Sequence, residues 1–370
     1  MEKEIVIVGA GSAGLMLSIE LARRGIHSTV YERKRRVDDG VEKASGILSK
    51  NGLDRMELEY RTSIINDLYG ADIFAGNEKL AVMAKSVVAY VVDRKKFINL
   101  FYSAAKEAGV DVLLGRELNR ETLVDMAGRG DKIIVGADGA LSHVASAFGF
   151  PPIHRFVLTY KAEFDGALVE DPKKVGVYVG ERYIKGFFGW MVPYGKSIAE
   201  VGIGIDSSAK KSSAVVFDSF LKNSSISNII SGSRKIAGHA SIIPLEVRKK
   251  TVLGNVMLLG DAAGQVKATT GGGIIFGILC AKIAAESIAK KLGGREPLGE
   301  YERRRRALYG ADLKMHNMIH SYYSFLNSIG PRNSGYFIKF LKALGVGEFL
   351  SKHGDMDSPK AMLKRVFIRK

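Results

Sequence analysis

A glycine-rich turn follows the first apolar run of the sequence and has the spacing of a phosphate-binding site. Residues 5–8 suit a buried strand, and the turn after them reads Gly9-Ala10-Gly11-Ser12-Ala13-Gly14. In this pattern the first glycine makes a tight turn, the second lets the backbone approach a pyrophosphate, and the third lets helix and strand pack closely. We therefore predict a dinucleotide site with the members Gly9, Gly11, Ser12, Ala13 and Gly14.

An acidic residue stands where a dinucleotide ribose needs a hydrogen-bond acceptor. A helical stretch ends at Gly25, and the strand Ser28–Glu32 that follows it ends on a carboxylate. A carboxylate at this place accepts hydrogen bonds from both ribose hydroxyls and repels a 2′-phosphate. Strand, turn, helix, strand and acid in register are more specific than the glycines alone. The basic run 33–36 suits a solvated loop, although Arg33, directly beside Glu32, is included among the cofactor-binding candidates.

A second motif near residue 260 also delivers small residues and an acid to a turn. The apolar run 256–259 is followed by Gly260-Asp261-Ala262-Ala263-Gly264, and Gly271-Gly272-Gly273 comes shortly after. A dinucleotide held by segments from both ends of the chain is more typical of FAD than of NAD. The sequence therefore predicts FAD as the cofactor.

These motifs and two further segments together resemble one family. The further segments are Asp93-Arg94-Lys95-Lys96-Phe97 and Gly136-Ala137-Asp138-Gly139. The set is similar to the FAD superfamily of para-hydroxybenzoate hydroxylase type, and more closely to the archaeal geranylgeranyl reductases of the digeranylgeranylglycerophospholipid reductase type. The similarity covers roughly residues 1–310, and its most specific part runs from Gly260 to Ile274.

The resemblance implies further cofactor contacts. Asp261 is expected to bond the ribityl chain, and the backbone of Gly271, Gly272, Gly273 and Ile274 to approach the pyrimidine edge of the flavin. Free N–H groups at a helix start stabilise the negative charge of a reduced flavin, and glycines let the backbone touch a flat ring. The resemblance also places cofactor contacts at Ala44, Arg94, Asp138 and Gly139. Arg94 could equally be a surface residue of its helix.

An aromatic segment resembles the box that lines the lipid cavity of geranylgeranyl reductases. It reads Phe188-Gly189-Trp190-Met191-Val192-Pro193, with phenylalanine where tyrosine is usual and valine where phenylalanine is usual. The resemblance implies substrate contacts at Phe188, Trp190 and Pro193. Strand alternation lets only one face line a cavity, either Phe188 with Trp190 or Phe187 with Met191. The alternative is that Trp190 simply packs the core of a strand.

The resemblance implies an FAD-dependent oxidoreductase acting on CH–CH groups. It would saturate C=C bonds of geranylgeranyl chains in archaeal-type membrane lipid precursors by hydride transfer from reduced flavin. The electrons would come from an external donor, either reduced ferredoxin or NAD(P)H. An unactivated alkene offers no carbonyl to polarise, so catalysis relies on holding the chain in a dry slot, and no catalytic residue is assigned.

Two departures from the family pattern bear on the chemistry. Ala268 stands where hydroxylases carry a proline, and Ala44 or Ser45 stands where some geranylgeranyl reductases place a cysteine near the flavin. A mechanism that needs this thiol is unavailable here. The alternatives are a flavin-dependent aromatic monooxygenase, a reductase of another polyprenyl substrate such as a quinone tail, a flavin halogenase, or a non-catalytic flavoprotein.

Composition limits the compartment and the partners. The 370 residues include one cysteine, so neither a disulfide framework nor a metal site is expected. No apolar run is long enough to span a bilayer, and the first strand leaves no room for a signal peptide, so a cytoplasmic protein is expected. The net charge of +16 suits an anionic partner, such as acidic lipid or an acidic electron donor, or else reflects a generally basic proteome. No nucleic-acid module accompanies it, so no nucleic acid is expected.

The expected fold class is α/β, with a Rossmann-like FAD-binding domain, an inserted antiparallel sheet and a helical C-terminal region. The FAD-binding domain comprises residues 1–154 plus 241–300, the substrate domain 155–240, and the helical region 301–370. Strands are predicted at Phe156–Phe164, Lys174–Val179, Gly186–Val192 and Ala199–Ile205.

The helical region also suggests a membrane surface. Apolar residues recur near helical spacing, in one group at Met315, Met318, Ile319, Tyr322, Tyr323, Phe325 and Leu326, and in another at Phe337, Phe340, Leu341 and Leu344. Lys339 and Lys342 flank the second group, and a basic amphipathic helix can lie among anionic headgroups. The prediction is peripheral attachment to the inner face of the cell membrane. The alternative is that the stripe packs on the core.

Overall fold

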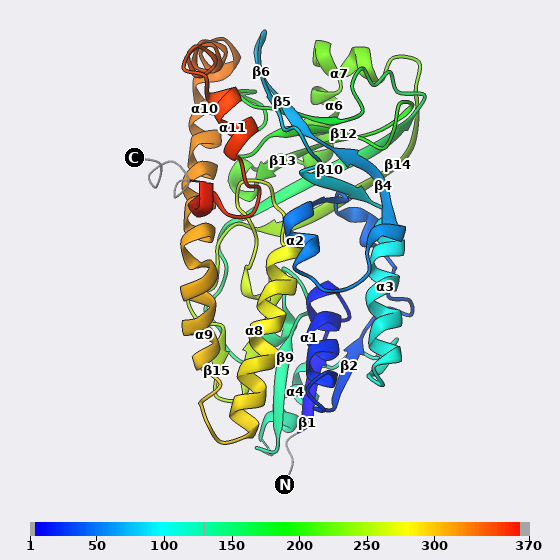
Figure 1. Cartoon of the computed structure of the whole chain (residues 1–370), viewed down its shortest axis with the longest axis vertical. Helices are drawn as coiled ribbons and strands as arrows, with labels where there is room; N and C mark the ends of the chain where they lie inside the picture. The colour runs from blue at the N-terminus through cyan, green and yellow to red at the C-terminus, as the bar shows by residue number, and fades with distance from the viewer. Residues whose placement is uncertain (1–3, 129, 363–370) are drawn as a thin grey trace.

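The computed structural model describes residues 4–128 and 130–362 and confirms the predicted fold class. Figure 1 shows an elongated molecule with a parallel sheet and its helices in the lower half and a larger sheet in the upper half. One long C-terminal helix runs along the side of both halves. The two halves are therefore joined by the end of the chain as well as by its crossings between the sheets.

The lower sheet has six strands in the order β15-β16-β9-β1-β2-β8. Its neighbours are parallel except for the pair β15–β16. The strands are β15 (Val252–Leu253), β16 (Val256–Leu258), β9 (Lys132–Gly136), β1 (Glu4–Val8), β2 (Ser28–Glu32) and β8 (Asp111–Leu114). The central strands are apolar runs because a parallel sheet is covered on both faces.

Helices cover both faces of the parallel sheet. Ile5 and Ile7 belong to the same core as the helices of one face, whereas Val6 packs with those of the other face. The first face carries α1 (Ser12–Ala22), α3 (Arg94–Glu107) and α8 (Ile274–Leu292), and the second carries α4 (Arg120–Gly128) and α5 (His143–Ala147). The carboxyl ends of the parallel strands point toward the upper half, where a ligand of such a sheet is expected.

The upper sheet has seven strands in the order β14-β10-β13-β12-β11-β5-β6. They are antiparallel except for the parallel pair β11–β5. The strands are β14 (Arg234–Pro244), β10 (Phe156–Asp165), β13 (Ile198–Asp206), β12 (Gly189–Pro193), β11 (Lys174–Tyr178), β5 (Gly70–Ala75) and β6 (Glu78–Met83). β5 and β6 lie outside the predicted range 155–240, so the sheet is larger than the segment that alternation marked.

Smaller elements complete the two halves. Helices α6 (Ser213–Phe220) and α7 (Ser224–Ile229) lie on the upper sheet, where Phe217 and Phe220 are fully buried. A three-stranded sheet joins the halves and consists of β3 (Ile47–Ser49), β7 (Ala89–Val92) and β4 (Ile64–Leu68), with the short helix α2 (Lys50–Asp54) after β3.

The described part of the predicted C-terminal region is mainly helical, and residues 363–370 of that region lie outside the described residues. The described part comprises α9 (Glu300–Arg305), a π-helical segment (Arg306–Gly310), α10 (Ala311–Ala343) and α11 (Val346–His353). The long helix α10 bends at Gly330, whose φ of 80° only glycine adopts readily, and Pro331 follows it. Across the described ranges, no helix is both long and apolar enough to cross a membrane.

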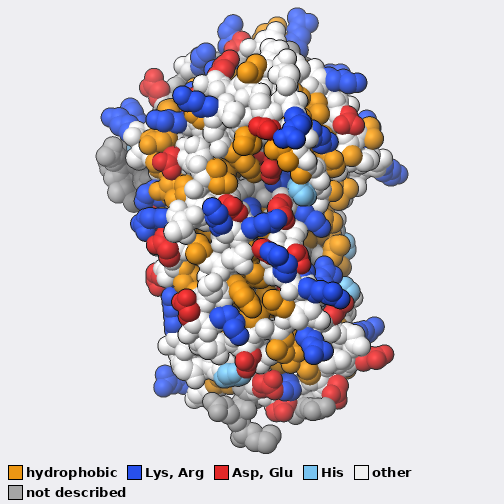
Figure 2. Space-filling view, turned by 90° about the vertical axis from the view of Figure 1, so that its right-hand side faces the viewer, with side chains coloured by type: hydrophobic (Ala, Val, Ile, Leu, Met, Phe, Trp, Pro, Cys, Tyr) orange, Lys and Arg blue, Asp and Glu red, His pale blue; other side chains and the backbone are white. Residues whose placement is uncertain are grey.

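The predicted strands and helices of the site are present, with ends shifted by a few residues. The strand predicted at Gly186–Val192 begins at Gly189, and the helix predicted to start at Gly272 starts at Ile274. Figure 2 shows that lysine and arginine side chains are spread over the height of one face, with acidic side chains among them. On that face the basic excess is thus dispersed rather than gathered in one patch.

Candidate functional site

A cavity of about 420 Å³ lies where the carboxyl ends of the parallel strands meet the upper sheet. Its lining comes from the turn after β1, the end of β2, the loop before β3, the start of α3, and strands β10, β11, β12 and β14. The turns after β16 and before α8 close it from another side. The volume falls in the ordinary range for a ligand site, and the place matches the rule for open α/β sheets.

The N-terminal glycines divide into packing positions and a ligand position. Gly9 has a φ of 106°, and a Cβ there would collide with the carbonyl of Ala137. A Cβ on Gly14 would collide with the carbonyl of Gly9. A Cβ on Gly11, by contrast, would meet nothing within 4 Å. Gly11, Ser12 and Ala13 line the cavity at the N-terminus of α1, where free N–H groups favour an anion.

Glu32 lines the cavity and is already tied to the turn. One of its carboxylate oxygens accepts a hydrogen bond from the backbone of Ala10 at 2.8 Å, and the other accepts one from Lys34 at 3.0 Å. Each oxygen keeps a lone pair for a ligand hydroxyl. Arg33, the next residue, is exposed and lies outside the cavity lining.

Asp138 does not line the cavity. Its carboxylate accepts hydrogen bonds from Ser142 Oγ at 2.6 Å and from the backbone of Val144 at 3.0 Å, so it stabilises the start of α5. Gly139 does line the cavity, with a φ of 86°. Of Asp138 and Gly139, only Gly139 therefore lies with the other predicted cofactor-binding residues in the cavity lining.

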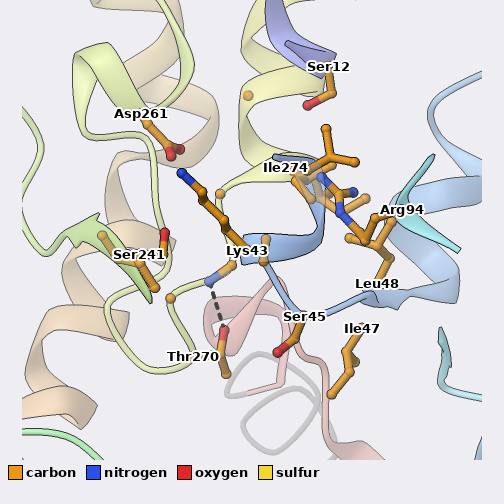
Figure 3. A pocket seen from close by; sticks show the side chains of 18 of the residues that line it. Ser12, Lys43, Ser45, Ile47, Leu48, Arg94, Ser241, Asp261, Thr270 and Ile274 are labelled. Atoms are coloured by element: carbon orange, nitrogen blue, oxygen red, sulfur yellow. Dashed lines mark hydrogen bonds between the residues drawn. The ribbon is translucent and has the colours of Figure 1, made fainter. Parts of the chain in front are cut away.

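Arg94 and Asp261 are half-buried residues whose charged groups face the cavity from opposite sides, as Figure 3 shows. Nε and Nη1 of Arg94 have no hydrogen-bond partner in the described chain, although the guanidinium lies 5.6 Å from the ring of Phe97. Burial lowers the pKa of Arg94 to about 10, so it is still charged at neutral pH. Burial raises the pKa of Asp261, and the charge of Arg94 opposes that shift. Arg94 thus directs a buried guanidinium into the cavity rather than lying on the outer surface of its helix.

This pair fits FAD, since the buried guanidinium nitrogens of Arg94 are costly without a partner unless a ligand satisfies them. Phosphate and carbonyl oxygens can accept from Arg94, and ribityl hydroxyls can donate to Asp261. FAD carries both kinds of group. The open space beside Gly11 and Gly139 leaves room for the backbone to approach such a ligand.

The glycine triplet leaves no room for side chains. A Cβ on Gly271 would lie 2.8 Å from Ile243, and one on Gly273 would lie 2.5 Å from Asp261 Oδ1. Gly271, Gly272 and Gly273 all line the cavity, as does Ile274 at the start of the 19-residue helix α8. No side chain caps this helix, so its first N–H groups stay available to a ligand.

The aromatic wall differs in part from the prediction. Phe188 and Trp190 line the cavity, but so does Phe187, which stacks on Phe188 with ring centroids 4.3 Å apart. The expectation that only one of two alternating pairs can line it was wrong, because alternation begins only where β12 begins, at Gly189. Pro193, at the end of β12, is buried outside the lining, and its carbonyl accepts from Asn66 Nδ2 at 3.0 Å.

Several cavity residues were not predicted. Lys267 lines the cavity and donates to Asp357 at 2.7 Å, and Ser49, another lining residue, donates to the same carboxylate. Met356 also reaches the cavity. Lys267 could have been predicted as a cavity residue, because it lies inside the segment from Gly260 to Ile274 that carries the resemblance. Nothing local in the sequence pairs it with Asp357, which is far away along the chain.

Comparisons with known proteins show the family of the chain. The FAD binding domain family matches residues 2–311. A digeranylgeranylglycerophospholipid reductase of Methanococcoides burtonii is 30% identical over 84% of this chain and 81% of the relative. An uncharacterized protein of Methanocaldococcus jannaschii is 29% identical over 98% of this chain and 94% of the relative.

Solved structures share the fold. A geranylgeranyl bacteriochlorophyll reductase-like protein of Thermoplasma acidophilum has a TM-score of 0.81 at 19% identity, covering 99% of this chain and 96% of that one. A flavin-dependent brominase has a TM-score of 0.74 at 14% identity, covering 100% and 98%. At these identities the structures support the architecture alone.

The prediction of FAD is confirmed by a family match over most of the chain and by a cavity whose free polar groups suit this cofactor. The relative of 30% identity covers 84% of the chain and is itself named a reductase. The chain therefore belongs to the geranylgeranyl reductase family of FAD-dependent oxidoreductases.

Proposed function

We propose that this protein saturates isolated C=C bonds in the geranylgeranyl chains of archaeal-type membrane lipid precursors. The observation that carries the proposal is an aromatic and aliphatic wall in the same cavity as the glycine triplet. Phe187, Phe188, Trp190 and the strand residues Val175 and Val177 belong to that lining. When bound, FAD supplies the hydride for the reaction.

The cofactor would be held mainly by the lower half of the cavity. The N-terminus of α1, with Gly11, Ser12 and Ala13, suits the pyrophosphate, and Glu32 suits a ribose. Asp261 would accept from the ribityl hydroxyls. The N–H groups at the start of α8 would face the flavin edge that becomes negative on reduction. Arg94 would donate to cofactor oxygens and so lose its unpaired state.

The substrate would be held by shape and by exclusion of water. An isolated alkene has no polar group for an acid or a base to polarise, so orientation is the main contribution that side chains can make. Aromatic side chains give large, rigid contact surfaces at low cost in conformational entropy. Phe188 and Trp190 meet edge to face at a centroid distance of 6.0 Å. A wall of this kind favours an isoprenoid chain over a charged ligand.

The electrons must come from outside this chain, and we propose reduced ferredoxin or NAD(P)H as the donor. The two are separated by following the flavin absorbance under anaerobic conditions after mixing with each donor. Bleaching by one donor at a rate that supports turnover identifies it. Reduction by dithionite alone would reject both.

We also propose that α10 rests on an anionic membrane surface. The apolar stripe divides, because Leu326 is buried in the core, Phe337 and Leu341 pack against it and Met315 and Ile319 are half-buried, whereas five other members are more than half exposed. The exposed side chains are Met318, Tyr322, Phe325, Phe340 and Leu344, together with Tyr336, which lies outside the predicted stripe. They recur every three or four residues on each side of the bend at Gly330, and Lys339 and Lys342 are exposed beside the second group. Tyr323, part of the predicted stripe, has a side chain outside the described set.

Binding to vesicles tests this surface. The wild-type protein should co-sediment with anionic vesicles more than with zwitterionic ones, and salt should weaken the binding. The variant Tyr336→Ser/Phe340→Ser should bind less. Leu168→Ser, which removes an equally exposed apolar side chain elsewhere, is the control and should bind as the wild type does. If the wild-type protein co-sediments with neither anionic nor zwitterionic vesicles, membrane attachment is refuted.

The activity itself is tested with dithionite-reduced holoenzyme and digeranylgeranylglyceryl phospholipid. Mass spectrometry should show the lipid gaining two hydrogens for each saturated bond. A quinone with a polyprenyl tail, offered under the same conditions, tests the other isoprenoid class. NAD(P)H-dependent oxygen uptake with hydroxylation of an aromatic compound, and no change in either lipid, would replace the proposal with a monooxygenase.

A further inference from the structure

A buried ion pair lies directly behind the wall of the cavity. Lys161 on β10 and Glu200 on β13 are joined by a 2.5 Å contact between Nζ and Oε2. Their side chains are 3% and 0% exposed. Burying each of the two charges costs several kcal/mol of lost solvation. Well-packed apolar side chains of similar volume, in place of a buried ion pair, often make a protein equally stable or more stable. A role in stability therefore does not account for this pair by itself.

Glu200 accepts hydrogen bonds from four different side chains. Oε2 accepts from Lys161 and, at 2.8 Å, from the hydroxyl of Tyr194. Oε1 accepts from the indole Nε1 of Trp190 at 2.8 Å and from the hydroxyl of Ser45. Burial alone would raise the pKa of Glu200, but the charge of Lys161 and these hydrogen bonds outweigh it, so the pKa is lowered and the carboxylate is ionised.

Two of the four donors belong to the cavity wall itself. Ser45 and Trp190 line the cavity, and they come from the loop before β3 and from β12. Lys161 also donates to the carbonyl of Ala44 at 3.3 Å, so the pair holds the backbone beside Ser45 as well. Ser45 is one of the labelled side chains of the cavity in Figure 3. The ion pair thus links two separate segments of the wall.

These bonds determine what the wall presents to a ligand. The only hydrogen-bond donor of the Trp190 side chain points to Glu200, and so does the hydroxyl hydrogen of Ser45. A donor that is satisfied behind the wall does not attract water or a polar ligand into the cavity. The indole ring and the serine methylene remain for contact with the ligand. An ionised carboxylate is the acceptor best suited to this, because it offers enough lone pairs for all four donors.

We propose that Glu200 is a positioning residue that keeps this wall dry by binding the two donors of Ser45 and Trp190, and that Lys161 holds Glu200 charged in that place. The proposal rests on the proposed function, since a dry wall matters most for an apolar chain. Glu200 is not among the residues that line the cavity, and it acts through Trp190 and Ser45. Its effect is on orientation and water exclusion, not on any proton given to the substrate.

The test removes the charges in two ways. Glu200→Gln keeps the size but leaves Lys161 buried without a carboxylate, so it measures the combined loss of stability and positioning. Glu200→Leu/Lys161→Met removes both charges, which restores stability but leaves the wall donors of Ser45 and Trp190, and the hydroxyl of Tyr194 behind them, without their acceptor. Adding Ser45→Ala and Trp190→Phe to the double variant then removes the donors too. Ile134→Val, in the core on the far side of the parallel sheet, is the control for ordinary destabilisation.

Trp190 provides a direct readout because it is the only tryptophan in the chain. In the holoenzyme, the double variant should shift its emission and make it easier for acrylamide to quench, because water reaches the freed indole. FAD occupancy and reduction by dithionite should stay at the wild-type level. Unchanged emission and quenching in a folded double variant would overturn the proposal, whatever the substrate is.

Turnover provides the second readout. The double variant should lose roughly 10- to 100-fold in kcat on the isoprenoid lipid, with a smaller change in KM, since misorientation of a bound chain is the expected defect. The fourfold variant, in which neither position 45 nor position 190 carries an unpaired donor, should recover part of that loss, while Ile134→Val should show none. A double variant with wild-type kcat would overturn the proposal. If the wild type reduces no isoprenoid at all, the proposed function fails, and the fluorescence of Trp190 still decides the role of Glu200.

Discussion

Replacing His316 by glutamine should remove a loss of stability that the wild-type protein suffers in mild acid. His316 lies on α10 and is buried, with Nδ1 2.8 Å from Thr269 Oγ1 and Nε2 3.4 Å from the carbonyl of Asp357. Burial, followed by the positive charge of Lys267, lowers the pKa of His316 to about 4. Asp357 and Asp312 act in the opposite direction but are weaker.

The direction of the effect follows from proton binding. In the unfolded chain the imidazole titrates near its ordinary value of about 6.5. Because the folded pKa is lower, the unfolded state binds more protons between the two values, so the free energy of unfolding falls as the pH falls through that window. The whole difference corresponds to about 3 kcal/mol, of which about 2 kcal/mol is lost between about pH 7.5 and about pH 5.

Urea unfolding of the holoenzyme at these two pH values measures the effect. His316→Gln stays neutral at both, so its free energy of unfolding should fall by about 2 kcal/mol less than that of the wild type. His27→Gln, which changes an exposed histidine paired with Asp111, is the control and should behave as the wild type does. An equal fall in the wild type and in His316→Gln would show that His316 is not held neutral, and the reasoning from burial and Lys267 would be wrong.

Three further predictions concern the cavity. Asp261→Ala should weaken FAD binding by about 1–3 kcal/mol, because a buried cofactor hydroxyl loses its acceptor, and fluorescence titration of the apoprotein with FAD measures this. Trp190→Ala should change the preference for chain length more than it changes FAD affinity; loss of FAD with an unchanged lipid preference would make Trp190 a cofactor support instead. Asp357→Asn should lower the free energy of unfolding by about 3–5 kcal/mol because Lys267 stays buried without a carboxylate, and Asp357→Leu/Lys267→Met should recover much of that loss in urea unfolding.

The cofactor half of the cavity could be predicted because its signals are local. A glycine turn, a helix and an acid at the end of the next strand occur within about thirty residues, and each step is dictated by backbone geometry. Gly9, Gly14 and Glu32 lie where this pattern places them. Asp138 shows the limit of such reasoning, because its carboxylate is used to cap α5 and only its neighbour Gly139 reaches the cavity.

The rest of the cavity depends on pairings that no local pattern encodes. Alternation marks β11 as a strand, but only the folded chain shows that it pairs in parallel with β5, which lies far away along the chain, and that the two extend one sheet. The carboxylates of Glu200 and Asp357 are paired with lysines on other elements, far away along the chain. A single sequence shows these residues as ordinary charges, because burial and partner are properties of the tertiary structure.

The charged groups around the cavity divide into two kinds, and the division supports the assignment of two ligands. Arg94 has guanidinium nitrogens without a partner among the described residues, as expected where a polar cofactor completes the bonding. Glu200 has all four of its donors in place, and Asp357 is paired with Lys267, so neither needs a ligand. A polar ligand would gain hydrogen bonds from Arg94 but none from Glu200. An apolar chain would lie against Ser45 and Trp190, whose donors are already bound to Glu200. A site for one polar ligand alone would have no use for donors turned away from the cavity, so the arrangement favours a cofactor and an apolar substrate bound together.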